Sequence, residues 1–104
     1  MDNIAIVREL KELLHGRFKD IRKVVFYGSR ATGHDGMDSD FDVLIVVGRL
    51  VDWKLENEII DACYEIDLRH DVQIDPKIIA ESDLSTVLGR QPFVVNALEN
   101  GVTV

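Results

Sequence analysis

Hydrophobic residues at the start of the chain recur every three or four positions. They are Ile4, Val7, Leu10, Leu14 and Phe18. This spacing places all five side chains on one face of a helix. The pattern therefore predicts a helix over about residues 3–18, with Gly16 marking fraying or an early end.

Two apolar runs follow the first helix, and each predicts a buried strand. The first run is Val24–Tyr27, which stops at Gly28, and the second is Phe41–Val47, which stops at Gly48. Glycine is a common strand terminator. Between the runs, residues 29–32 are compatible with a helical turn, and two further glycines predict a loop.

The second half of the chain predicts another helix and a third strand. Asp52 is suited to cap a helix over about residues 53–68. The buried face of that helix would consist of Leu55, Ile59, Ala62, Cys63 and Ile66. Residues 71–75 alternate polar and apolar side chains, as in a half-buried strand. Pro76 should end regular pairing or leave the strand at a sheet edge.

Three features are expected near the C-terminus. Residues 81–88 fit a loop or short helix, and Pro92 fits the first turn of a last helix that ends at Gly101. The inward side chains of that helix would be Phe93, Val94, Ala97 and Leu98. Residues 102–104 could add a short strand. The order α-β-β-α-β-α predicts an α+β fold, with one sheet flanked by helices in a single domain over residues 1–104.

Composition narrows the class of protein. The 104 residues are 46% hydrophobic and 30% charged, as in an ordinary soluble domain. No apolar run approaches the roughly 20 residues that cross a bilayer. Cys63 is the sole cysteine, which fits a reducing, cytoplasmic setting. The formal net charge of −7 disfavours a nucleic-acid substrate, because tight binding of nucleic acid needs Lys and Arg to neutralise phosphates.

The chemistry-bearing stretch is residues 28–42, GSRATGHDGMDSDFD. Gly28-Ser29 forms a small-residue turn at a strand end, where backbone N–H groups can hold phosphate. Asp40 and Asp42 are two residues apart on an extended chain, so they point the same way with Cα atoms roughly 6.5–7 Å apart. Such a pair can bridge hard cations. Without a cation, one of the two should bind its proton more tightly than a lone Asp.

A solvated edge strand is the bland alternative for an Asp-x-Asp pair. Here the pair coincides with the Gly-Ser turn and with strands on both sides. Asp35 and Asp38 add two more carboxylates within eight residues, a density that needs open water or a metal. This context favours a functional site. His34 lies in the same loop and could touch a nucleotide, although a solvated loop histidine is the simpler interpretation.

The string Gly28-Ser29, ten residues, Asp40-x-Asp42 resembles the motif of the nucleotidyltransferase superfamily that includes DNA polymerase beta. The chain looks most like the minimal nucleotidyltransferases of prokaryotes, in segments such as GSRATG, SDFDVLIVV and PFVVNALENGV. The resemblance implies a mixed sheet flanked by helices. It also implies transfer of a nucleoside monophosphate from an NTP, here AMP from ATP, to a hydroxyl acceptor.

The same resemblance implies roles for individual residues. Asp40 and Asp42 would bind magnesium, two ions being expected, and Gly28 and Ser29 would hold the β- and γ-phosphates. Arg30 could add a cation near the triphosphate, or be a solvated turn residue. A third carboxylate would come from the adjacent strand, where Asp71 is preferred over Asp75. Close relatives sometimes lack this acid, so both could be ordinary strand-end residues.

Small members of this family are often encoded beside a helical HEPN-domain protein, with which they form a toxin–antitoxin pair. The resemblance therefore implies a HEPN partner, with this chain as antitoxin and the partner as protein acceptor. Two functions stay open: a magnesium-dependent adenylyltransferase, or a catalytically idle antitoxin that binds and neutralises its toxin. Small-molecule nucleotidyl transfer ranks lower, since such enzymes usually carry a second domain.

Overall fold

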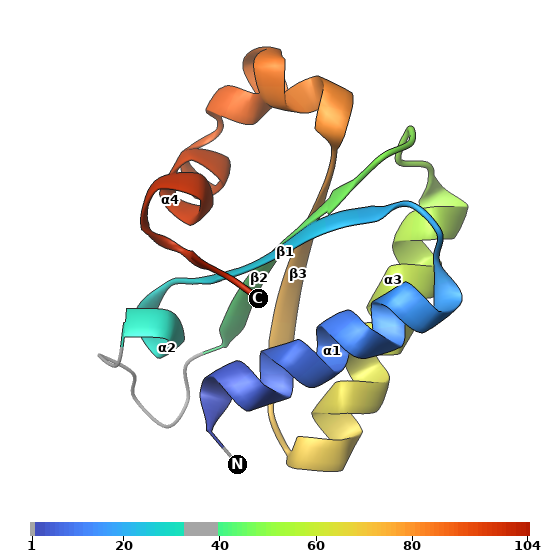
Figure 1. Cartoon of the computed structure of the whole chain (residues 1–104), viewed down its shortest axis with the longest axis vertical. Helices are drawn as coiled ribbons and strands as arrows, with labels where there is room; N and C mark the ends of the chain where they lie inside the picture. Colours follow the sequence, from blue (N-terminus) through green and yellow to red (C-terminus); the bar gives the residue numbers. More distant parts are fainter. Residues whose placement is uncertain (1, 33–39) are drawn as a thin grey trace.

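The protein is built around a four-stranded mixed sheet, seen in a computed structural model that describes residues 2–32 and 40–104 (Figure 1). The strands are β1 (Ile21–Tyr27), β2 (Phe41–Val47), β3 (Ile74–Ala80) and β4 (Val102–Thr103). They are arranged in the order β3-β2-β1-β4. β1 runs antiparallel to both β2 and β4, whereas β2 and β3 are parallel. The predicted α+β class and mixed sheet are confirmed.

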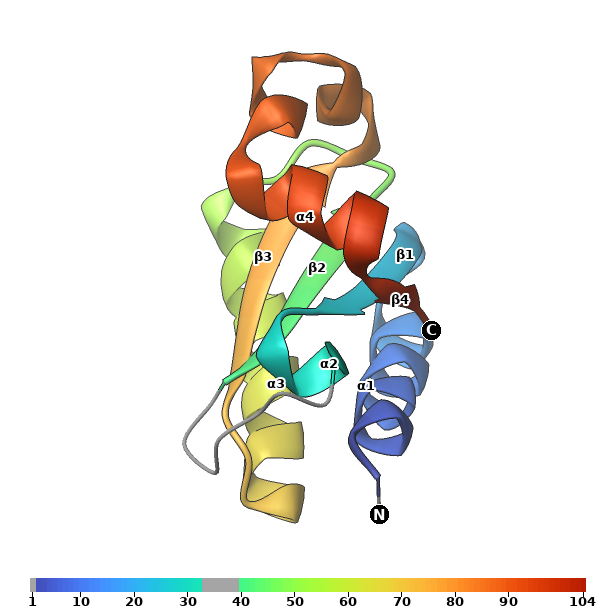
Figure 2. The same cartoon turned by 90° about the vertical axis from the view of Figure 1, so that its left-hand side faces the viewer.

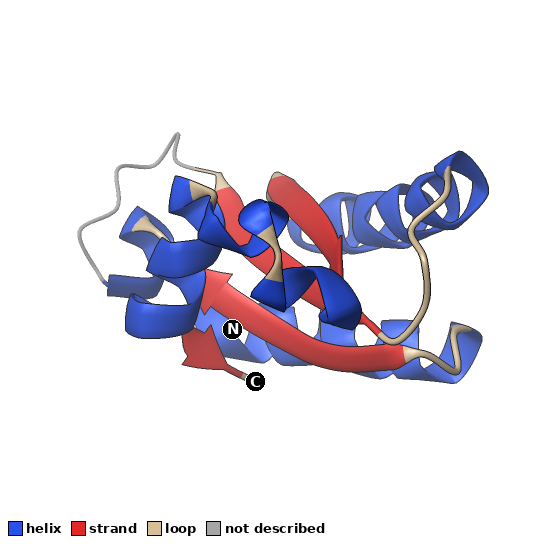
Figure 3. Cartoon of the chain, turned by 90° about the horizontal axis from the view of Figure 1, so that it is seen from above, coloured by secondary structure: helices blue, strands red, loops and turns tan. Residues whose placement is uncertain are grey.

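Helices lie on both sides of this sheet (Figure 3). α1 (Asn3–Arg17) and α3 (Trp53–His70) pack on one face, and α4 (Pro92–Asn100) packs on the other. α2 (Ser29–Thr32) is a single turn after β1, and two 3₁₀ turns, Glu81–Ser85 and Val87–Arg90, connect β3 to α4. No helix among the described residues is long and apolar enough to span a bilayer.

The larger core lies between the sheet and the α1/α3 layer. Most residues of the two predicted apolar faces are buried there, including Leu10, Leu14, Ile59 and Ile66 at 0% exposure. Ile4 and Phe18, at the two ends of the first predicted face, are only partly buried. The rings of Phe26 and Phe41 stack in this layer with centroids 5.5 Å apart. Residues of β2 that point to this face, such as Val43 and Ile45, belong to the same cluster. This layer is a continuous apolar core of the kind that dominates folding free energy.

The core under α4 is smaller. It contains Val94 and Ala97 of α4 against residues of three strands, which are Val25, Tyr27, Leu44, Val46 and Ile79. Figure 2 shows α4 crossing one half of the sheet, away from the end that carries α2. Leu98, predicted to face inward, is 44% exposed, so that prediction is wrong. The helix is short, and its buried side is only as wide as Val94 and Ala97.

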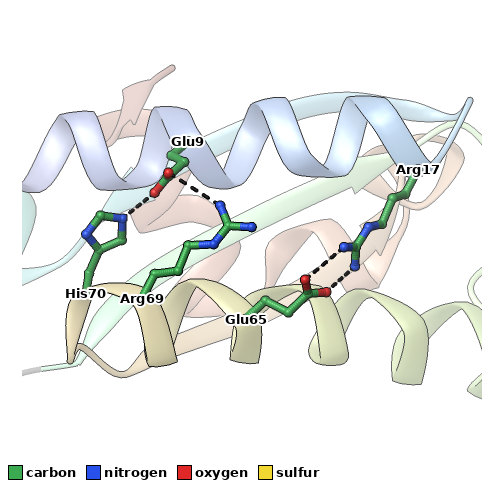
Figure 4. A network of polar contacts seen from close by, with 5 residues as sticks. All are labelled: Glu9, Arg17, Glu65, Arg69 and His70. Carbon is green, nitrogen blue, oxygen red and sulfur yellow. Dashed lines mark hydrogen bonds and ion pairs between the residues drawn. The ribbon is translucent and has the colours of Figure 1, made fainter.

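Ion pairs connect α1 and α3 along their solvent side (Figure 4). The carboxylate of Glu9 accepts a hydrogen bond from His70, and its Oε1 lies 3.4 Å from Nη1 of Arg69. Arg17 and Glu65 form a bidentate ion pair. The His70 contact lowers the pKa of Glu9, and the Arg17 contact lowers the pKa of Glu65. Exposed pairs of this kind contribute little to stability, so the shared apolar core holds the two helices together.

Two strand boundaries differ from those predicted. β1 begins at Ile21 rather than Val24, because exposed Arg22 and Lys23 interrupt the apolar pattern at a register shift. β3 spans Ile74–Ala80 rather than 71–75. It is an edge strand, which is where a sheet tolerates a proline such as Pro76.

The reason for the shift of β3 is the length of α3. This helix continues to His70 and ends at Asp71, whose backbone is left-handed with φ 51°. The N–H groups of Asp71 and Val72 both donate to the carbonyl of Asp67. Residues 71–73 therefore form the helix-to-strand turn. The N-cap at Asp52 is confirmed by its side chain, which accepts from the N–H of Leu55 at 2.8 Å.

Candidate active site

Three polar side chains form a row across the sheet. Tyr27 of β1 is paired with Asp42 of β2, and Asp42 is paired with Asp75 of β3. Directly paired residues project to the same face, here the face that α4 covers in part. Asp42 and Asp75 precede the α4-covered residues Leu44 and Ile79 along their strands. Both carboxylates consequently lie on the half of this face that α4 does not cover.

The carboxyl group of Asp42 has an environment unfavourable to its negative charge. Its pKa is raised above 3.8 by partial burial, then by the charges of Asp75 and Asp40, while Lys77 opposes the shift. The sequence predicted that one member of the Asp40/Asp42 pair would hold its proton tightly, and Asp42 is that member. Asp75 contributes more to this shift than Asp40 does, so the cross-strand neighbour is the stronger charge partner.

The hydroxyl group of Tyr27 is affected by the charges of the same two carboxylates, Asp42 and Asp75. Burial, followed by Asp42 and Asp75, raises the pKa of its hydroxyl to about 12. The phenol therefore stays protonated at neutral pH, as a neutral neighbour at the β1 end of the row.

The Gly28 backbone contacts Asp42 directly. Gly28 has φ 82°, a left-handed conformation that costs L-residues about 1–2 kcal/mol. A Cβ atom added at this position would overlap Oδ2 of Asp42. The carbonyl of Gly28 accepts from Ala31 N at 3.1 Å, which closes the α2 turn. The two halves of the predicted motif, turn and carboxylates, are thus in van der Waals contact.

Asp67 is a fourth carboxylate near the site, and the sequence analysis did not single it out. Its Oδ1 accepts from the N–H of Ile74 at 2.9 Å, at the start of β3. Burial raises the pKa of Asp67, the hydrogen bond from Ile74 lowers it, and Asp40 raises it. Asp67 of α3 is therefore hydrogen-bonded to the start of β3 and is close enough to Asp40 for the two charges to interact. Asp67 lies in the last turn of α3, and no sequence motif there indicates its hydrogen bond with Ile74.

Lys77 is a second residue that the sequence analysis missed. Its Nζ lies 3.7 Å from Oδ1 of Asp75 and 5.9 Å from the centroid of the Phe93 ring. Lys77 lies two positions after Asp75 on β3, so both side chains point to the same face. The predicted strand ended at residue 75, before Lys77. A prediction that extended the strand to residue 80 would have placed Asp75 and Lys77 on the same face.

Arg30 lies at the same end of the sheet but contacts the other core. Its guanidinium is 4.9 Å from the centroid of the Phe41 ring, which belongs to the α1/α3 layer. The carbonyl of Arg30 accepts from Asn3 Nδ2 at 3.4 Å, so α2 is attached to the start of α1. Ser29 is the exposed first residue of α2. The structure thus brings Gly28, Ser29 and Arg30 to the carboxylate end of the sheet.

Asp71 is not where the sequence placed it. The expectation that it enters a strand beside Asp75 is wrong, because it is the left-handed cap of α3. Asp75, the less preferred alternative, is the acid paired with Asp42. His34, Asp35 and Asp38 lie outside the described residues.

The donor set suits a hard divalent cation. Asp40, Asp42 and Asp75 offer carboxylate oxygens, which Mg²⁺ prefers, and a cation would relieve the repulsion that raises the pKa of Asp42. Within residues 2–32 and 40–104, no three His, Cys, Asp or Glu side chains are gathered closely enough to hold an ion as they stand. The carboxylate of the partly exposed Asp75 lies beside Lys77, with Nζ 3.7 Å from Oδ1.

Comparison with known proteins agrees with this geometry. The profile of the family described as "Polymerase beta, Nucleotidyltransferase" matches residues 8–95. The chain is 34% identical over 79 residues to "Putative protein adenylyltransferase MJ0141" of Methanocaldococcus jannaschii, covering 75% of this chain and 80% of that protein.

Solved structures share the fold. A mutant of the toxin–antitoxin complex MntA-HpeT superposes with a TM-score of 0.62 at 16% identity, covering 92% of this chain and 69% of the other. A toxin–antitoxin structure with AMP-PNP gives 0.60 at 21% identity, with coverages of 92% and 69%. The sequence matches, supported by this common fold and by a turn and carboxylates in contact, show that the chain belongs to the polymerase beta nucleotidyltransferase family.

Proposed function

We propose that the chain transfers AMP from ATP to a hydroxyl group of a HEPN-domain partner protein, in a magnesium-dependent reaction. The observation that carries this proposal is the contact between the Gly28 turn and Asp42 within a row that ends at Asp75. Phosphate-binding backbone and metal-binding carboxylates thereby belong to one site. The adenylyltransferase name of the M. jannaschii relative and the AMP-PNP in a structural neighbour support the choice of ATP.

Asp40, Asp42 and Asp75 are the residues that would hold magnesium, with Asp75 taking the place first given to Asp71. Bound divalent ions lower the pKa of an attacking hydroxyl and neutralise charge on the phosphates. The chain's own part is positional: β2 and β3 hold the carboxylates in register, and Asp67 fixes the start of β3 through the N–H of Ile74.

The Gly28-Ser29 turn is proposed to hold the β- and γ-phosphates. A side chain at position 28 would collide with Asp42, so only glycine lets the turn approach the carboxylates this closely. Close approach matters because phosphates and metal ligands must share the same ions. Arg30, whose guanidinium lies 4.9 Å from the centroid of the Phe41 ring, is proposed as a nearby cation for the triphosphate.

A second candidate function is binding alone, with the chain as an idle antitoxin that neutralises its partner by complex formation. The Lys77–Asp75 ion pair favours it, because this lysine already neutralises the third acid. In an idle protein that pair would persist in the presence of MgATP.

Label transfer separates the two candidates. The protein is incubated with magnesium, ATP labelled at the α-phosphate, and the HEPN-domain product of the adjacent gene. The enzyme proposal expects label on the partner, lost in Asp42→Asn and retained in Asp20→Asn, a carboxylate that lies before β1 at the opposite end of that strand. Absence of label with wild-type protein that still binds and silences its partner would favour the idle antitoxin.

A further inference from the structure

The solvent side of α3 carries a stripe of large apolar side chains. Trp53, Ile60, Tyr64 and Leu68 are 77%, 42%, 60% and 68% exposed, respectively. Their spacings of seven, four and four residues place them along one line of the helix. Trp53 and Leu68 are fifteen residues apart, so this α3 stripe is about 22 Å long.

The α3 stripe is not the margin of the buried core. The buried residues of α3 are Leu55, Ile59, Ala62, Cys63 and Ile66, which lie on nearly the opposite side of the helix when each residue turns 100°. A helix packed on a sheet needs one apolar face. A second apolar line in water, on a chain with formal charge −7, points to a surface that another molecule covers.

Charges beside the stripe define the chemistry of that molecule. Glu56, Glu58 and Asp61 of α3 are exposed acids, and Lys54 is an exposed base on the same helix, whereas Glu65 and Arg69 are already paired with α1. Among the described residues, no ion pair engages Glu56, Glu58 or Asp61. A second copy of the chain would bring these acids against each other. A partner with basic residues beside an apolar line would be attracted instead.

We propose that the α3 stripe is the docking surface for an amphipathic helix of the partner protein, with Lys or Arg flanking its apolar line. This inference rests on the proposed function only for the identity of the partner, the HEPN-domain protein. The α3 stripe lies on the outer side of the α1/α3 layer, while Asp42 and Asp75 project on the α4 side of the sheet. The side chains of the α3 stripe differ from those of the Asp42 row, so docking and catalysis are separable by mutation.

The test measures affinity for the HEPN-domain product of the adjacent gene by titration calorimetry. Tyr64→Lys and Leu68→Lys remove apolar contact and repel a basic partner, so each should raise Kd at least about tenfold. Val87→Lys is the matched control, an equally exposed apolar residue on the second 3₁₀ turn, and it should change Kd less than about twofold. Asp61→Lys should weaken binding, and added salt should weaken wild-type binding.

Two further measurements keep this inference distinct from the proposed function. The melting-temperature rise given by MgATP should be unchanged in Tyr64→Lys, and Asp42→Asn should bind the partner as wild type does. Equal Kd values for Tyr64→Lys, Leu68→Lys and Val87→Lys would overturn the docking surface, as would no wild-type binding. Dimerisation that is lost in Leu68→Lys would overturn it in favour of a second copy. Normal docking without label transfer would instead overturn only the enzyme proposal.

Discussion

The two faces of the sheet are covered very differently. On one face α1 and α3 bury an uninterrupted apolar layer, and their charged residues pair at its outer side (Figure 4). On the other face α4 buries a smaller cluster and leaves the row of Asp42 and Asp75 uncovered. Mutual repulsion of carboxylates is a cost in stability. We call the α1/α3 side of the sheet the thick face and the α4 side the thin face. The repelling carboxylates lie on the thin face, while the continuous core of the thick face supplies most of the folding free energy.

The largest effect on stability is expected from the thick face. Ile66 of α3 is fully buried, and Ile66→Ala removes its packing and leaves a cavity, which should lower the free energy of unfolding by about 2–5 kcal/mol. Urea denaturation measures this loss. MgATP affinity of the remaining folded protein should be unchanged, and a specific loss of it would break the division between the faces.

The largest effect on activity is expected from the thin face. Asp75→Asn should reduce label transfer at least about 100-fold, the upper value seen even for outer partners of metal ligands. Asp71→Asn should leave transfer within a few-fold, because Asp71 is the C-cap of α3 and not a member of the paired strand row. Both rates are compared at equal folded fraction. The reverse ranking would restore Asp71 as the third acid.

An intermediate effect is expected at Gly28. Gly28→Ala places a methyl group against Oδ2 of Asp42 and strains φ 82°, so it should cost about 1–2 kcal/mol of stability and displace the carboxylate. Gly16→Ala is the matched control, since nothing lies within 4 Å of its added Cβ. In a helix this control should gain up to about 1 kcal/mol. Thermal denaturation and label transfer measure both variants, and intact transfer in Gly28→Ala would separate the turn from the acids.

The smallest effect is a pH dependence set by Asp42. Because the pKa of this carboxyl is raised in the folded state, the native protein binds its proton more tightly than the unfolded chain does. Its contribution to stability is therefore present at low pH and lost as pH rises through the folded pKa. Magnesium affinity should change in the opposite sense and rise with pH. It should fall by up to about tenfold for each unit by which the pH is lowered, because protons then compete for the carboxylate.

Calorimetric titration with magnesium at a series of pH values, upward from the ordinary Asp pKa of about 4, checks this opposition, with Asp42→Asn as the control that lacks the proton. Parallel changes in stability and affinity would show that Asp42 is not a metal ligand.

Sequence patterns predicted the thick face far better than the thin one. The faces of α1 and α3 follow a 3.6-residue period over many turns, so Leu10 and Ile66 were placed correctly. β3 was misplaced because the residues at 71–75 alternate like a strand while the backbone is still completing α3. Asp71 takes a left-handed conformation that the local pattern does not reveal. Contacts such as Asp67 to Ile74 depend on tertiary packing and leave no periodic signal.

Asp67 has a consequence for how this chain can vary in length. Its carbonyl holds the N–H groups of Asp71 and Val72, and its carboxylate holds that of Ile74. One residue therefore governs the whole connection between α3 and β3, without any glycine in it. An insertion there would break several of these bonds at once and move Asp75 relative to Asp42, while leaving the apolar layer behind the sheet intact. The connection acts as a spacer of fixed length, whose residue count matters more than its composition.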